Sequence, residues 1–178
     1  MTLKPYTLFL LTFFLLPILV GCGGENKAQA VAPFSHADWQ STPEQIAALH
    51  EENAKTTVSL YGGSSYLFPV TWLEHEGTVK YMYNEKNQLM SIAFYYEADS
   101  AESLTALYDR IRSMASQSYG KSITTTNQDN LGERWIRSEG NIILAAFWNE
   151  ESCALQYSFL HPEVSRDAEG NLVSLADL

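Results

Sequence analysis

Two stretches of alternating side chains, joined by a short polar turn, constrain the fold of this chain most strongly. Apolar side chains occupy every second position in residues 78–83 and again in residues 89–96. Such alternation places the apolar groups on one face of a β-strand. The polar turn at 84–87 is too short for a crossover, so the two strands must pair antiparallel. The apolar sets are Val79, Tyr81 and Tyr83, then Met90, Ile92, Phe94 and Tyr96.

Other segments extend this sheet and add two helices. A short helix is expected to begin at the capping sequence Thr42-Pro43-Glu44-Gln45 and to end near Asn53. A longer helix follows Ser100 and ends before Gly120, because apolar residues between them recur at spacings of three and four. The predicted fold class is α+β: a mainly antiparallel sheet with helices packed on one face, one short and N-terminal, the other longer and central. Further strands are expected at 56–61, 66–73, 122–126, 133–137, 142–148 and 153–159.

The first 21 residues have the layout of a secretory signal. Lys4 supplies a positive start, an apolar run continues to Val20, and the small residue Gly21 comes next. The run of about 13 residues is shorter than the ~20 that a membrane-spanning helix needs. Its end, Leu19-Val20-Gly21-Cys22, resembles the lipobox of bacterial lipoproteins.

This resemblance covers residues 1 to about 24 and implies a lipid anchor. In that family a diacylglyceryl group is joined to the cysteine sulfur, here Cys22, and the bond between Gly21 and Cys22 is cleaved. The implied location is the cell membrane, or the outer membrane if the cell has one, with the protein on the extracytoplasmic side. An ordinary signal peptide with an incidental cysteine and an uncleaved anchor are the alternatives.

Length and charge constrain the part of the chain after the signal. Removing 21 of 178 residues leaves 157, a common size for one domain. The 11 basic and 21 acidic residues include one lysine in the signal, so the remaining charge is 10 − 21 = −11. Such a surface repels phosphate backbones, so no nucleic-acid binding is expected, and it suits cationic partners. The expected segments are a signal peptide (1–21), a flexible tether (22–33), a single α+β domain (34–161) and a polar, partly disordered tail (162–178).

The sequence contains no recognisable motif for catalysis, a cofactor or a metal. Ser64-Ser65 come after Gly62-Gly63 but lack the pattern of a nucleophile elbow, so a turn is expected there. Cys153 has no partner if Cys22 carries lipid, and its place in an apolar strand favours a buried small side chain. The histidines do not stand at the spacing of paired metal ligands; they are His36, His50, His75 and His161.

Aromatic and methionine side chains of the strands point to a binding surface instead. Most aromatic residues should be core, because they bury large areas. Alternation leaves Met82 and Tyr95 on the face opposite the core set, and one side of the strand ending at Trp148 is expected to join them. A sheet face that carries such side chains without a helix suits a protein or peptide partner. Cover by the N-terminal helix or by loops is the alternative.

These observations favour a membrane-anchored envelope lipoprotein, a non-enzymatic module for protein or peptide binding or for assembly with an unidentified envelope partner. A small-ligand-binding lipoprotein is the first alternative, and an enzyme with an unrecognised site is the second. The order of helix and strands also resembles small secreted bacterial folds of the β-lactamase-inhibitor-protein type and other uncharacterised lipoproteins.

Overall fold

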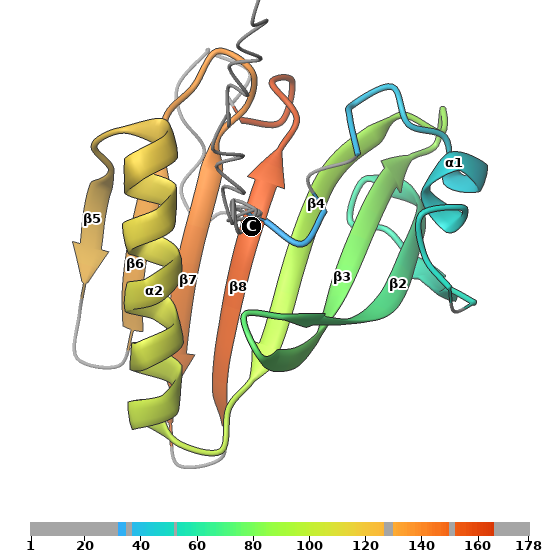
Figure 1. Ribbon diagram of the computed structural model, residues 1–178. Coiled ribbons are helices and arrows are strands. Elements are labelled where there is room, and N and C mark those ends of the chain that lie inside the picture. Colours follow the sequence, from blue (N-terminus) through green and yellow to red (C-terminus); the bar gives the residue numbers. More distant parts are fainter. Residues whose placement is uncertain (1–31, 35–36, 52, 127–129, 150–151, 166–178) are drawn as a thin grey trace, which may run out of the picture.

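A single antiparallel sheet forms the body of the protein. The computed structural model describes residues 32–34, 37–51, 53–126, 130–149 and 152–165, and within them eight strands pair in the order β1-β2-β3-β4-β8-β7-β6-β5 (Figure 1). Helix α1 (Pro43–Ala47) precedes β1, and helix α2 (Ala101–Tyr119) precedes β5. The strands are β1 (Lys55–Val58), β2 (Gly62–Trp72), β3 (His75–Asn84), β4 (Leu89–Glu97), β5 (Ile123–Thr126), β6 (Asn130–Trp135), β7 (Ile142–Trp148) and β8 (Cys153–Leu160).

The sheet consists of two meanders that meet at its centre. Strands β1 to β4 pair in chain order, and strands β5 to β8 do the same. The two halves join where β4 pairs antiparallel with β8, with Phe94 opposite Tyr157 in the middle of the seam. Each half starts with a helix, so the order of one helix and four strands occurs twice along the chain.

The prediction of an α+β fold with helices packed on one face is wrong, because the sheet dominates the molecule. Among the described residues, 46% lie in strands and 19% in helices. Helix α1 has only five residues and ends at Ala47, well before Asn53. Helix α2 is the longer one, and it lies along one face of the sheet in contact with β7 and β8 (Figure 1).

Chain segments other than helices cover the rest of that face, which explains why a second long helix is unnecessary. The tip of the β2–β3 hairpin curls across the sheet, and the Trp72 ring stacks on Tyr157 with centroids 5.9 Å apart (Figure 1). Phe34, from the segment before α1, packs edge-on against Phe159 at 4.9 Å. Burying side chains of this size contributes about 1.5–3 kcal/mol each. We call this surface, which α2 shares, the core face.

Local sequence explains where the helices begin and end. The hydroxyl of Thr42 accepts from the backbone N–H of Gln45, whose side chain accepts from the N–H of Thr42, so the predicted capping box is confirmed. Ser100 caps α2 in the same way, with its hydroxyl 3.2 Å from the N–H of Ser103. Gly120 ends α2 at a φ of 83°, which glycine adopts without strain.

The β2 strand begins and ends differently from the expectation. Residues Gly62 to Ser65 open β2 instead of forming a turn, and the pairing register shifts there. Strand β1 pairs with β2 only as far as Leu67, so Pro69 lies on an open edge, as its missing N–H favours. The turn after β2 consists of Leu73 and Glu74 alone, since Trp72 already pairs with His75.

The packed body extends beyond the predicted domain limits at both ends. Ala32 and Phe34 are buried in the core, so the last tether residues belong to the body. Ser165 is also buried and accepts, through its hydroxyl, from the backbone N–H of Asn141 at 2.9 Å. The predicted signal (1–21), most of the tether (22–31) and most of the tail (166–178) lie outside the described residues. Neither helix of the described part has the length and hydropathy needed to cross a bilayer.

Candidate functional site

The sheet face that α2 does not cover, which we call the outer face, carries two of the three predicted binding residues. Ser65 of β2 pairs with Met82 of β3, and Met82 pairs with Ser91 of β4. These three side chains therefore form one row on the same face of the sheet. Pairing of Thr78 with Tyr95 sets another row on the same face. Met82 and Tyr95 therefore lie on one surface, as their alternation predicts.

Trp148 lies on the opposite, core face. In β7 it alternates with the buried residues Leu144 and Ala146, and it packs against the core. The outer-face residue at this end of β7 is its neighbour Phe147, whose exposed fraction is 44%. The strand is apolar on both faces, so its sequence alone does not distinguish which aromatic faces the solvent.

Met82 and Tyr95 differ in how far a partner can reach them. Met82 is buried, with 3% of its surface exposed, whereas Tyr95 is half-buried. Burial raises the pKa of the Tyr95 phenol, and the nearby Tyr61 adds to this effect. Tyr61 belongs to the turn between β1 and β2. Tyr95 is consequently the better candidate for direct contact with a partner.

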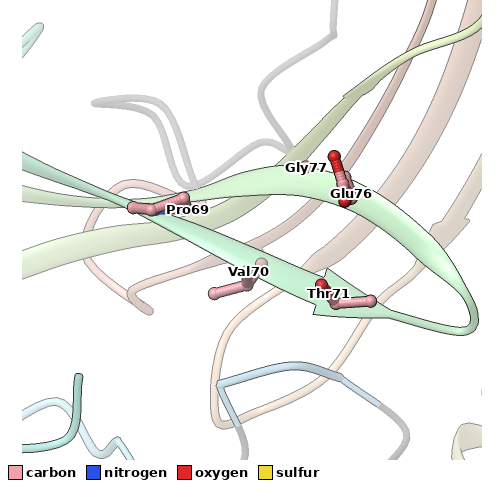
Figure 2. Close-up of a pocket in the computed structure, with 5 residues that line it drawn as sticks. All are labelled: Pro69, Val70, Thr71, Glu76 and Gly77. Atoms are coloured by element: carbon pink, nitrogen blue, oxygen red, sulfur yellow. The ribbon is translucent and has the colours of Figure 1, made fainter. Parts of the chain in front are cut away.

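An open depression lies beside Tyr95 at the end of the outer face. One part, of about 310 Å³, lies between Pro69–Thr71 of β2 and Glu76–Gly77 of β3 (Figure 2). An adjoining part, of about 420 Å³, continues to Thr78, Tyr95 and Glu97. Both parts are lined by Pro69, Glu76 and Gly77, so they form one continuous surface feature, which we call the Tyr95 depression.

Gly77 helps to shape this region. A β-carbon at this position would lie 2.5 Å from the Phe94 ring and 2.6 Å from the backbone oxygen of Tyr95. Such distances are far below normal van der Waals contact, so only glycine lets β3 and β4 approach here. The glycine was not recognised from the sequence as part of a site.

Two carboxylates flank the Tyr95 depression without a cationic partner. Glu76 of β3 and Glu97 of β4 both line the part of the depression beside Tyr95. Both are exposed, and neither forms an ion pair within the described part of the chain. Two like charges that line the same depression repel each other. A cationic group placed between them would remove that repulsion, and the Tyr95 ring offers a further cation-binding surface.

Two other polar groups, Glu133 and His50, have partners within the described residues. Glu133 of β6 is buried, with its carboxylate 2.8 Å from the Nε of Arg112 and within 3.1 Å of the donating hydroxyl of Thr124. This cluster fastens α2 to β5 and β6. His50 stacks on Phe68 at 3.9 Å and lies 3.1 Å from the Tyr81 hydroxyl, and burial lowers the pKa of its imidazole.

Metal and thiol chemistry find little support in the described residues. No group of three or more His, Cys, Asp or Glu side chains gathers there as metal ligands would. His75 instead packs against the Tyr96 ring at 4.8 Å. Cys153 is a free, half-buried thiol that packs against the core. Cys22, the predicted lipid attachment residue, and Gly21 lie outside the described residues.

Comparison with known proteins adds no relative to this picture. No family model, no curated protein and no solved structure matches the chain.

Proposed function

We propose that this protein is a lipid-anchored module of the cell envelope, without enzymatic activity, that binds a basic segment of another envelope protein or peptide at the Tyr95 depression. The lipobox at residues 19–22 supports the anchor. The observation that carries the binding role is the pair of carboxylates without an ion-pair partner, Glu76 and Glu97, beside the half-buried Tyr95 on a sheet face without a helix.

The chemistry of the depression favours a peptide segment as its ligand. Pro69 and Tyr95 offer apolar contact, while Thr71 and Thr78 offer hydroxyl groups. The depression is open and shallow, so it suits side chains of a partner that lies along the surface. The net charge of −10 attracts a basic segment over longer distances and raises its rate of association.

The anchor is tested by Cys22→Ser. Two acyl chains hold a protein stably at a membrane, since each buried methylene contributes about 0.8 kcal/mol. The variant should lose its fatty acid and either enter the soluble fraction or remain unprocessed, as mass spectrometry and fractionation will report. A native protein whose first residue carries no fatty acid, or unchanged retention and processing of the variant, would contradict the anchor.

The binding site is tested by photo-crosslinking in cells. A photoreactive amino acid at Thr71, on the rim of the depression, should give a defined crosslinked product, whereas the same group at Gln117 on the exposed side of α2 should not. The double change Glu76→Gln and Glu97→Gln should reduce that product at least tenfold, because the attraction for a basic segment is lost.

A matched control changes two exposed carboxylates elsewhere, Glu85→Gln and Glu163→Gln, and removes the same charge. It should leave the crosslinked product within twofold of the original. Equal loss in both double variants would assign the effect to net charge alone and would contradict a site at Tyr95.

A further inference from the structure

A second, apolar pocket lies on the core face, where the chain enters the body from its N-terminal side. Its floor is formed by Ile92 of β4 and Phe159 of β8, and Tyr119 at the end of α2 forms one wall. Phe34 and Trp39, from the segment before α1, form the other wall. The pocket is partly open to solvent, and its volume is about 320 Å³, at the lower end of the range of small-molecule sites.

The walls of this pocket are held in place by contacts outside it. The Phe159 ring meets Phe34 and Tyr119 edge-on, at 4.9 and 6.0 Å. The indole N–H of Trp39 donates to the backbone oxygen of Glu139 at 3.0 Å, and the guanidinium of Arg137 lies over the Tyr119 ring at 4.9 Å. A pocket whose aromatic walls are already fixed loses little entropy when a ligand enters.

The chemistry of the lining selects an uncharged, apolar ligand. Among the described residues that line this pocket there is no Asp, Glu, Lys or Arg, whereas Glu76 and Glu97 line the Tyr95 depression. A charged group would lose its hydration there without a compensating partner. The Tyr119 hydroxyl is the polar exception, and burial raises its pKa, so it stays protonated.

The pocket lies only a few residues along the chain from the expected lipid anchor, which is a source of apolar ligands. Ala32, at the rim, lies 32 − 22 = 10 residues after Cys22. Ten residues span at most about 35 Å when extended. A chain anchored at Cys22 therefore keeps the pocket within that distance of acyl chains.

We propose that this pocket binds a fatty acyl chain. The presence of acyl chains near the pocket rests on the proposed lipid anchor. The ability of the pocket to hold an acyl chain rests only on its lining residues and its volume. Transfer of about ten methylenes from water to the pocket is enough for micromolar binding. The source is either the lipid on Cys22 or a lipid of the surrounding membrane.

Quenching of tryptophan fluorescence by a brominated fatty acid tests the pocket directly, because Trp39 lies in its wall. The full chain carrying Cys22→Ser should show saturable quenching with added dibromostearate. In that background, Trp39→Phe should remove the saturable component and leave the emission of Trp72, Trp135 and Trp148 unquenched. No saturable quenching, or quenching that persists in Trp39→Phe, would overturn the proposal.

A filling substitution separates occupancy of the pocket from loss of fold. Ala37 lines the pocket, so Ala37→Leu should place a larger side chain in it and weaken binding at least tenfold, with a melting temperature close to that of the parent. The control Ala47→Leu, at an exposed position of α1, should bind like the parent. Equal affinity in both variants would overturn the proposal, as would equal loss in both.

A further experiment identifies the source of the acyl chain and keeps the two proposals separate. In the native lipidated protein, reduced quenching by the added acid would assign the pocket to the chain on Cys22, and undiminished quenching would assign it to membrane lipid. The double change Glu76→Gln and Glu97→Gln should leave quenching unaltered. Absence of binding at the Tyr95 depression can therefore be measured independently of absence of binding at the acyl pocket. The quenching measurement on the Cys22→Ser variant does not require lipidation.

Discussion

At the scale of single residues, the ring and the hydroxyl group of Tyr157 make different contributions to the stability of the sheet. Its ring lies at the central seam, opposite Phe94 and stacked on Trp72, and it is fully buried. Its hydroxyl has no hydrogen-bond partner among the described residues. Burial raises the pKa of Tyr157, because a phenolate there would lose its hydration. The ring therefore stabilises the core by packing, whereas the buried hydroxyl group does not stabilise it.

We accordingly expect Tyr157→Phe to stabilise the protein. Removing a buried hydroxyl without a partner should raise the free energy of unfolding by about 1 kcal/mol, since the cost of its lost hydration disappears. The matched control is Tyr83→Phe, because the Tyr83 hydroxyl donates to the backbone oxygen of Ser41 at 3.0 Å. That variant should lose about 1 kcal/mol. Urea denaturation measures both, and a loss of stability in Tyr157→Phe would show that its hydroxyl has a partner.

The candidate site shows which residues the sequence can and cannot predict. Tyr95 was found because alternation along one strand assigns it to a face. Glu76 and Glu97 were not predicted as a pair, since their common place in the Tyr95 depression depends on how β3 and β4 lie together in the sheet, which no single strand encodes. Trp148 was grouped with Tyr95 because its strand is apolar on both sides, and only the pairing with β6 and β8 places it on the core face.

At the scale of elements, the β2–β3 hairpin carries backbone strain at its tip. Leu73 and Glu74, the two turn residues, have φ angles of 53° and 71°. Two-residue turns with both φ angles positive favour asparagine and glycine. Leu73 is nonetheless buried, and its backbone oxygen accepts from Arg110 of α2 at 3.3 Å. Contacts of the tip with the core and the helix therefore hold it in a conformation that its own residues do not prefer.

Relief of this strain is testable at the second turn residue. Glu74 is exposed, so Glu74→Gly changes the backbone preference without opening the core. A positive φ costs a non-glycine residue roughly 1–2 kcal/mol, and the greater freedom of glycine in the unfolded chain offsets part of the gain. Thermal unfolding should show a net gain of about 1 kcal/mol, whereas Glu74→Ala, which keeps a β-carbon, should show none. A melting temperature lowered by glycine would contradict the assignment of strain.

At the scale of the whole molecule, the sequence predicted the antiparallel strands but not the balance between sheet and helix. Alternation and short turns decide strand pairing locally, and the chain carries both signals clearly. The cover of the core face was harder to predict, because the curled β2–β3 tip and the segment around Phe34 act where helices were expected. The expected elements already follow the order of one helix and four strands twice, but the pairing of β4 with β8 that joins the two halves was not predicted.

This repeated order has a physical consequence. The last strand of each half pairs with the last strand of the other, running in opposite directions, which is how two copies of a shorter chain would associate about a two-fold axis. Half of this protein alone would expose that strand as an open edge and would depend on meeting a second copy. Because both halves belong to one polypeptide, their encounter is intramolecular, and the assembled state does not vary with dilution.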